Sequence, residues 1–259
     1  MKRSVSLLVF ISFRLISFSQ EIHPHVNAHS HNDYENPQPL IHAYNKGFMS
    51  VEADVHLVNG RLRVSHNAPD SKARLLSELY LRPLDSIAAI QRSTNPKYGS
   101  FFLMIDIKTE AEVTYRTLDQ LLRGYNLLTC LNADHNCPVV IFLSGNRPVD
   151  LIIKDPNSRI ALDGRPSDLG KNYPTHKMPV ISDNFNNWSS WNGKSKPADG
   201  ALDRIKDLAK RVHAEGKKLR LWAIPDNELA WQTLLDTGVD LINTDHIDEL
   251  DKFLTEKGL

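Results

Sequence analysis

The sequence predicts an α/β protein built as a single (β/α)8 TIM barrel, and two observations carry this prediction. From residue 26 onward, eight short apolar runs alternate with amphipathic helical patterns, which is typical of a parallel sheet with crossover helices. Polar residues also collect directly after the apolar runs, and barrel enzymes carry their sites at the C-terminal ends of the strands. The 259 residues suit one such domain.

Each element follows from one of these two patterns. The apolar runs predict strands at residues 26–28, 49–55, 101–107, 139–143, 159–162, 179–182, 218–223 and 240–243. The helical spacing of apolar residues predicts helices at residues 40–45, 75–91, 111–125, 150–154, 201–214, 227–235 and 247–254. Glycine often closes a helix, and this residue stands where four helices should end, at Gly47, Gly124, Gly216 and Gly238.

Residues 1–20 have the pattern of a secretory signal peptide. Lys2 and Arg3 precede an apolar stretch at residues 5–13, and small polar residues follow it. The apolar stretch is too short to span a bilayer, and a disordered or interfacial N-terminus is the alternative. We therefore expect residues 21–259 to form a secreted or periplasmic domain.

The charge balance and the cysteines of the sequence argue against nucleic acid as a partner and against a zinc site. Lys and Arg number 31, as do Asp and Glu, so no global positive field attracts nucleic acid. Cys130 and Cys137 are compatible with a small disulfide loop in an oxidising compartment, or with a pair of thiols. No matching histidine pattern accompanies them, so they give no zinc signature. The sequence leaves the oligomeric state open.

Residues 51–67 contain the densest group of candidate site residues. Side chains alternate along an extended segment, so Glu52 and Asp54 point to the same face. Two carboxylates held together repel each other unless a cation lies between them, which predicts one divalent cation, Mg²⁺ or Ca²⁺. An Asn-Gly pair at residues 59–60 predicts a hairpin turn that returns His66 to the same strand.

Asp106 and Lys108 interrupt the next apolar run, Leu-Met-Ile-Asp-Ile-Lys, on one face. An apolar strand rarely buries two charges unless they pair with each other or hold an ion. Asp106 is therefore a third candidate metal ligand, with a structural salt bridge as the alternative. His29 and His31 follow the first strand. Because imidazole titrates near neutral pH, two histidines that flank a metal can serve as general base and general acid.

These motifs carry a family resemblance that spans nearly the whole expected domain. His-Ser-His, Glu-x-Asp, a histidine after a hairpin and Asp-Ile-Lys resemble the phosphatidylinositol-phospholipase-C-like phosphodiesterases, which include glycerophosphodiester phosphodiesterases and spider-venom sphingomyelinase D. The segments Leu-Trp-Ala-Ile-Pro-Asp-Asn and Asp-Thr-Gly-Val-Asp-Leu-Ile-Asn-Thr-Asp resemble the last two strands of that group. Ala-His-Ser-His-Asn-Asp-Tyr and Asn-Thr-Asp-His are most similar to a branch that includes a fungal mitochondrial-inheritance protein and many secreted bacterial proteins.

The resemblance implies that Glu52, Asp54 and Asp106 bind the divalent ion. Asp106 stands where glycerophosphodiesterases more often have Glu, and it matches the sphingomyelinase D form. The usual His-Arg-Gly is His-Ser-His here, so the phosphate-binding arginine of that motif is missing. Arg165 is a candidate substitute for it.

The resemblance also implies the catalytic and substrate-binding residues. His66 would form the catalytic pair with His31 or with His29, and we favour His31, with His29 supporting it. Lys108 would bind phosphate, and Trp222 would wall the substrate pocket.

The implied activity is metal-assisted attack on a glycerophosphodiester or phospholipid-type phosphodiester. The ion would neutralise the nonbridging oxygens. One histidine would take a proton from water, or from a neighbouring hydroxyl of the substrate, and the other would protonate the leaving alcohol. Hydrolysis and formation of a cyclic phosphate are both compatible with these residues, as are small-molecule and lipid substrates.

Two other functions compete with this interpretation. His-x-His after the first strand also opens the metal site of amidohydrolases and PHP-like metal hydrolases. Those barrels need further histidines after the middle strands, where this chain has Ser144, Asp163 and Asp183. A catalytically silent barrel that binds a ligand would be favoured by a lost catalytic position, but each position has a candidate here.

The long loop after the sixth expected strand contains three aromatics, at residues 184–191. Tryptophan suits an interface with one wet side, so this loop is a candidate lid or a transient contact to a membrane surface. A loop anchored by its own aromatics is the alternative.

Overall fold

The computed structural model describes residues 22–70, 72–94, 99–125, 128 and 137–259. The expected signal peptide and Cys130 lie outside the described residues. Cys137 is disulfide-bonded. None of the helices in the described ranges combines the length and the hydropathy that a membrane span requires.

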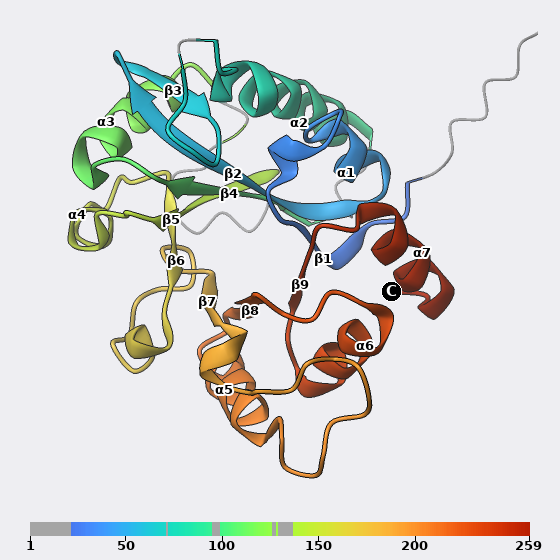
Figure 1. Ribbon diagram of the computed structural model, residues 1–259. Helices are drawn as coiled ribbons and strands as arrows, with labels where there is room; N and C mark the ends of the chain where they lie inside the picture. The colour runs from blue at the N-terminus through green and yellow to red at the C-terminus, as the bar shows by residue number, and fades with distance from the viewer. Residues whose placement is uncertain (1–21, 71, 95–98, 126–127, 129–136) are drawn as a thin grey trace, which may run out of the picture.

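Eight parallel strands close into a barrel, as predicted (Figure 1). Their order is β1-β9-β8-β7-β6-β5-β4-β2, and pairing of β1 with β2 closes the ring. The strands are β1 His25–Ser30, β2 Phe48–Val58, β4 Phe101–Ile107, β5 Val139–Gly145, β6 Ala161–Gly164, β7 Val180–Asn184, β8 Lys218–Trp222 and β9 Leu241–Thr244. Each corresponds to a predicted strand, so the alternation of apolar runs and helical patterns was a sufficient signal.

A ninth strand, β3 Arg61–Val64, forms the predicted hairpin with β2. Asn59 and Gly60 have φ values of 50° and 72°, and a type I′ turn requires positive φ at both central residues. The tight turn brings the chain straight back, and the Ser65 N–H donates to the Asp54 carbonyl at 3.1 Å. The residue after Ser65 is thereby placed at the C-terminal end of the barrel.

Helices cover the outside of the barrel (Figure 1). They are α1 Ile41–Asn45, α2 Arg82–Thr94, α3 Ala111–Leu122, α4 Val149–Lys154, α5 Asp203–Ala214, α6 Glu228–Thr237 and α7 Ile247–Lys257. The helix predicted at residues 75–91 differs in one respect, because a π-helical turn at Ser77–Leu81 precedes α2. Pro83 has no N–H to donate, so a regular α-helical hydrogen-bond ladder cannot run through this junction.

The interior of the barrel is apolar toward the N-terminal ends of the strands and polar toward their C-terminal ends. A buried apolar cluster fills its lower part, with Met104, Phe142, Ala161, Val180 and Leu241. Side chains two residues apart on a strand share a face, so Asp106 stands above Met104 and Ser144 above Phe142. The strands therefore direct a ring of polar side chains to the C-terminal end.

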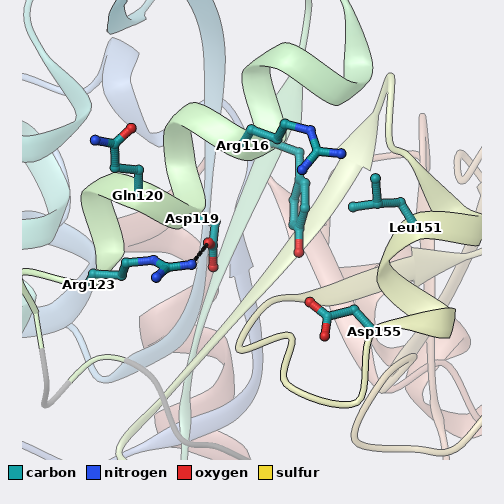
Figure 2. A pocket seen from close by; sticks show the side chains of 7 residues that line it. Arg116, Asp119, Gln120, Arg123, Leu151 and Asp155 are labelled. Carbon is teal, nitrogen blue, oxygen red and sulfur yellow. Dashed lines mark hydrogen bonds and ion pairs between the residues drawn. The ribbon is translucent and has the colours of Figure 1, made fainter.

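A separate hollow of about 580 Å³, the outer groove, lies on the surface between α3 and α4 (Figure 2). Arg116 of α3 and Arg123, the residue directly after α3, line it, and each pairs with a carboxylate four residues earlier. Arg116 lies 2.6 Å from Glu112, and Arg123 lies 2.9 Å from Asp119. The charges of both pairs are thus matched between residues four positions apart along the chain.

Candidate active site

The C-terminal ends of the strands surround a cavity of about 300 Å³, the central pocket. Its lining comprises His31, Asn32, Glu52, Asp54, His66, Asp106, Lys108, Ser144, Gly145, Arg165, Arg220, Trp222 and Ala223. Every candidate site residue from the sequence is present except His29. One pocket therefore brings together residues from strands across the whole barrel.

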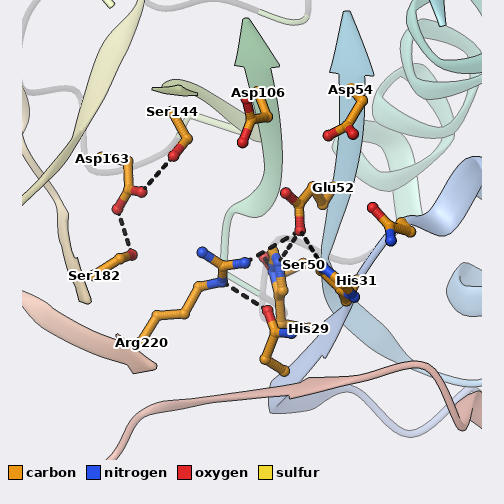
Figure 3. A network of polar contacts seen from close by, with 12 residues as sticks. His29, His31, Ser50, Glu52, Asp54, Asp106, Ser144, Asp163, Ser182 and Arg220 are labelled. Atoms are coloured by element: carbon orange, nitrogen blue, oxygen red, sulfur yellow. Dashed lines mark hydrogen bonds and ion pairs between the residues drawn. The ribbon is translucent and has the colours of Figure 1, made fainter. Parts of the chain in front are cut away.

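Three carboxylates meet in the pocket, from β2 and its neighbour β4 (Figure 3). Oxygens of Glu52, Asp54 and Asp106 all lie within 4.8 Å of one another. This arrangement follows from register, because Asp54 and Asp106 are paired across the two strands and Glu52 precedes Asp54 on the same face. The group could hold a metal ion, as expected from the sequence.

Asp54 shows why the residues present fit a cation. Its Oδ2 atom accepts from Tyr34 Oη at 2.9 Å and from His66 Nδ1 at 2.9 Å, and Lys108 Nζ lies 3.0 Å away. Its Oδ1 atom is buried and has no hydrogen-bond partner among the described residues. A buried carboxylate oxygen without a partner is costly, and an oxygen-seeking divalent cation would satisfy it.

Glu52 is held from the opposite wall of the barrel. Nη2 of Arg220 on β8 lies 3.1 Å from its Oε2, and Nε of Arg220 donates to Asn243 Oδ1 at 3.0 Å (Figure 3). Burial would raise the pKa of Glu52, but the charge of Arg220 and the neighbouring histidines lower it to about 2. Glu52 is therefore ionised throughout the physiological range, as a metal ligand must be.

Asp106 shares Lys108 with Asp54. Lys108 Nζ lies 3.2 Å from Asp106 Oδ1, and burial would lower its pKa, but the two carboxylates raise it above the ordinary value. Burial raises the pKa of Asp106, and the charges of Glu52 and Asp54 add to this effect while Lys108 opposes it. A divalent cation would reverse this tendency by favouring the ionised carboxylate.

The backbone beside Asp106 is also fitted to the pocket. Gly145, at the end of β5, has a φ of 65°, and a Cβ atom there would collide with the Asp106 carboxylate and lie 2.6 Å from the Ile107 carbonyl. Only glycine adopts this conformation without strain and leaves that space free.

The histidines occupy two different environments. His31 and His66 line the pocket with 31% and 58% of their side chains exposed, and each presents Nδ1 to a carboxylate, Asp245 or Asp54, at 2.8 and 2.9 Å. Each imidazole therefore has its orientation fixed and its Nε2 atom left for chemistry. Burial would lower the pKa of His31, but Asp245 and Glu52 raise it above the ordinary value.

His29 lies beneath the pocket and is fully buried. Its Nδ1 atom is 2.6 Å from Ser50 Oγ, and its Nε2 atom is 3.7 Å from Glu52 without a hydrogen bond. Burial, together with the charge of Arg220, lowers the pKa of His29 to about 4. It is therefore neutral near pH 7 and packs under Glu52, and its expected support of a catalytic histidine stays a prediction.

The two remaining predicted substrate contacts meet on the other side of the pocket. The Arg165 guanidinium carbon lies 5.1 Å from the centroid of the Trp222 ring. Nη1 of Arg165 donates to Asp163 Oδ2 at 2.8 Å, and buried Asp163 also accepts from Ser144 and Ser182 (Figure 3). Asp163 thus fixes the direction of the guanidinium.

Sequence reasoning missed four residues of the site. Arg220 and Tyr34 contact two of the acids directly, Asp163 orients Arg165, and Asp245 orients His31. Arg220 could have been found, because it precedes Trp222 by two residues on β8 and must share its face. Tyr34 ends the family-like motif Ala-His-Ser-His-Asn-Asp-Tyr, but it lies in a short 3₁₀ helix after β1, Asp33–Glu35, where strand alternation cannot predict which way a side chain points.

The aromatics of the loop after β7 are held by the protein itself. Phe185 is buried, the Trp188 indole donates to Asp183 at 2.9 Å, and the Trp191 indole donates to the Ser195 carbonyl at 2.7 Å. The Trp188 ring also lies 5.2 Å from the Arg204 guanidinium. These contacts account for the aromatics as anchors, and membrane contact stays a prediction.

The family model and the similar proteins that match this chain all belong to one named group. The family model for an AIM6-like phosphodiesterase domain matches residues 16–162, which include the three acids, the three candidate histidines and Lys108. Altered inheritance of mitochondria protein 6 of Eremothecium gossypii is 29% identical over 266 residues, covering 87% of this chain and 68% of that protein. The Kluyveromyces lactis protein of the same name is 30% identical over 300 residues, covering 88% and 72%.

A homologue in Arthroderma benhamiae is 28% identical over 265 residues, covering 86% of this chain and 82% of that protein. The names of these relatives refer to mitochondrial inheritance and not to a reaction. The match to the family model covers more than half of the chain, and the alignment to the Kluyveromyces lactis protein covers 88% of it. The chain therefore belongs to the AIM6-like phosphodiesterase domain family.

Proposed function

We propose that this protein is a metal-dependent phosphodiesterase that acts on glycerophosphodiester or phospholipid-type phosphodiesters. The observation that carries the proposal is the combination of three clustered carboxylates with two carboxylate-bound histidines in one pocket. Amidohydrolase-type sites need further histidines after the middle strands, and Ser144 and Asp163 occupy those ends of the described chain. Membership of a family described as phosphodiesterases supports the same conclusion.

Glu52, Asp54 and Asp106 would hold one divalent cation, Mg²⁺ or Ca²⁺. When bound, the cation would neutralise charge on the nonbridging oxygens of the phosphodiester. Lys108, beside two of the ligands, would contact a phosphate oxygen. The bound phosphorus atom would then lie next to the two histidines.

His66 and His31 would move the protons. Asp54 holds Nδ1 of His66, so Nε2 would accept a proton from water or from a hydroxyl of the substrate. Asp245 holds Nδ1 of His31 and raises its pKa, which favours His31 as the group that protonates the leaving alcohol. His29 would stay neutral and support Glu52 from below.

The protein would act outside the cytosol. The expected signal peptide of residues 1–20 and the disulfide-bonded Cys137 support a secreted or periplasmic location. Residues 184–191 remain the candidate for transient contact with a membrane surface, which vesicle co-sedimentation with Trp191→Ala would test.

The direct test is turnover of a panel of glycerophosphodiesters and lysophospholipids by the purified protein, in EDTA and with added Mg²⁺ or Ca²⁺. We expect metal-dependent release of alcohol, and His66→Gln should lower kcat by about 10²- to 10⁴-fold because it removes the proton acceptor. His213→Gln is the matched control, because His213 also pairs with an aspartate, Asp240, but lies on the outer surface.

Phosphorus NMR of the product would separate hydrolysis from formation of a cyclic phosphate. No turnover of any diester with metal bound would favour the silent barrel instead. An equal loss of kcat in the His66 and His213 variants would show that His66 does not transfer a proton in the reaction.

A further inference from the structure

Two arginines lie at one wall of the central pocket, and among the described residues only one of them, Arg165, forms an ion pair. Arg165 uses Nη1 for three acceptors, namely Asp163 Oδ2, the Asp163 carbonyl and the Gly164 carbonyl. Nη2 has a single long contact, 3.3 Å to Ser144 Oγ, and Nε has no hydrogen bond among the described residues. The guanidinium is therefore anchored at one corner and leaves N–H donors for a ligand.

A second arginine stands beside this wall without a counterion. Arg147 follows β5 by two residues, and its Nη1 atom donates to the carbonyl of Gly145, which lines the pocket, at 3.3 Å. Its Nε atom is buried with no partner, and in the described chain no carboxylate lies within 4.0 Å of its guanidinium. Burial lowers the pKa of Arg147, and the charge of nearby Arg165 lowers it further, while the charges of Asp163, Asp168 and Asp106 oppose this shift without outweighing it.

An unpaired, half-buried guanidinium next to another guanidinium is unfavourable in the free protein. Both groups gain if an anion binds between them, since arginine donors match phosphate and carboxylate oxygens in a planar fork. The three carboxylates of the metal site do not supply this anion. They face Lys108 and Arg220, and a divalent cation would engage them further.

We propose that Arg147 and Arg165 form a subsite for a second anionic group, so that the substrate is a phosphodiester carrying a phosphate or a carboxylate on one of its two alcohols. This inference rests on the proposed phosphodiesterase function and narrows its substrate class. The scissile phosphodiester would lie at the acids and Lys108, and the second anion at the wall formed by β5 and β6.

The same wall disfavours a cationic head group. Quaternary ammonium groups bind well on the open face of a tryptophan ring. Here the Arg165 guanidinium covers Trp222 at 5.1 Å, so a choline group would meet an occupied face and a like charge. Choline esters are therefore expected to be poor substrates.

Two matched pairs of diesters test the subsite. Glycerophosphoinositol and its 4-phosphate differ by one phosphate, and glycerophosphoethanolamine and glycerophosphoserine differ by one carboxylate. In Mg²⁺ we expect kcat/KM to be higher by about tenfold or more for the anionic member of at least one pair, the size expected for charge-assisted hydrogen bonds. The pair that responds identifies which anion the subsite takes.

Arg147→Gln should abolish this preference, mainly through KM, while leaving turnover of the member without the second anion within about twofold. It should also leave the thermal midpoint unchanged or higher, because it removes an unpaired buried charge. Arg116→Gln is the matched control, since Arg116 lies on the outer groove and is paired with Glu112. Arg165→Gln is less informative alone, because it also leaves buried Asp163 without its cation.

The outcomes separate the two proposals. Turnover of both members of each pair with equal kcat/KM, or the same loss of preference in Arg116→Gln, would overturn the anion subsite and leave the phosphodiesterase standing. If no diester turns over, calorimetric titration of the wild type and of both variants with inositol 1,4-bisphosphate decides whether the anion subsite exists. Binding that weakens in Arg147→Gln alone would support the subsite without the activity, and equal binding by both variants would overturn it.

Discussion

The central pocket and the outer groove are both lined by charged side chains, but their charges are paired differently. In the outer groove each arginine has its own carboxylate one helical turn earlier, and both arginines are more than half exposed. In the central pocket Asp54 Oδ2 accepts from Tyr34 and His66 and pairs with Lys108, whereas its Oδ1 atom has no partner among the described residues. Exposed ion pairs contribute little to the free energy of folding. A buried polar or charged group without a partner lowers the stability of the free protein, and a ligand that pairs with it removes this cost.

The largest difference between the two cavities should appear when one carboxylate in each is neutralised. Asp54→Asn removes a candidate metal ligand and the partner of His66, so kcat for a diester should fall by about 10³-fold or more. Mg²⁺ affinity measured by calorimetry should fall with it. Asp119→Asn in the outer groove should change neither quantity, and a comparable loss there would mean that the pairing pattern does not distinguish the cavities.

The second difference concerns pH. The pKa of His29 is about 4 in the folded protein and 6.5 when exposed, so the unfolded chain binds more protons between these values. Stability contributed by neutral His29 is complete above pH 6.5 and is lost as the pH falls toward 4, by roughly 3 kcal/mol. Chemical denaturation in EDTA at several pH values should show this loss.

His29→Gln should flatten that part of the stability profile, because glutamine does not titrate. His213→Gln, on the outer surface, should keep the wild-type slope between pH 6.5 and 4. A profile of unchanged slope in the His29 variant would assign the loss to other groups and would contradict the burial argument.

A smaller difference separates two glycines. Gly145→Ala would force a Cβ atom against the Asp106 carboxylate, whereas Gly60→Ala at the β2–β3 turn meets nothing within 4 Å, and both positions have positive φ. The turn variant should lose about 1 kcal/mol of unfolding free energy, and the pocket variant about 1–3 kcal/mol more because its neighbour must move. Urea unfolding of both variants would measure this. Equal losses of unfolding free energy would show that the residues around Gly145 move aside at no measurable cost.

Much of the barrel and of the acid cluster could be predicted because both depend on local pattern. The Glu-x-Asp spacing fixes one face of β2, and the Asn-Gly turn fixes the return of the chain to His66. Asp106 joins them because parallel register places it opposite Asp54. Each step needed only neighbouring strands.

The remainder of the site depends on contacts across the barrel that no local pattern encodes. Arg220 reaches Glu52 from β8, and Asp245 reaches His31 from the segment after β9. The choice between His29 and His31 as the residue that faces the pocket also depended on this packing, since both lie at the end of β1 with the same spacing parity. Closure of the ring buries the first and leaves the second at the surface of the cavity.

Closure of the ring through β1 and β9 also sets when the site can come into existence. The Glu52–Arg220 and His31–Asp245 hydrogen bonds join residues 168 and 214 positions apart. A growing chain that has produced the acids and His66 still lacks both of these partners until its last two strands have been synthesised. The order of synthesis thus delays assembly of the proposed catalytic machinery to the final stage, so no nascent chain that ends before Asp245 carries the complete set of contacts around the acids and His31.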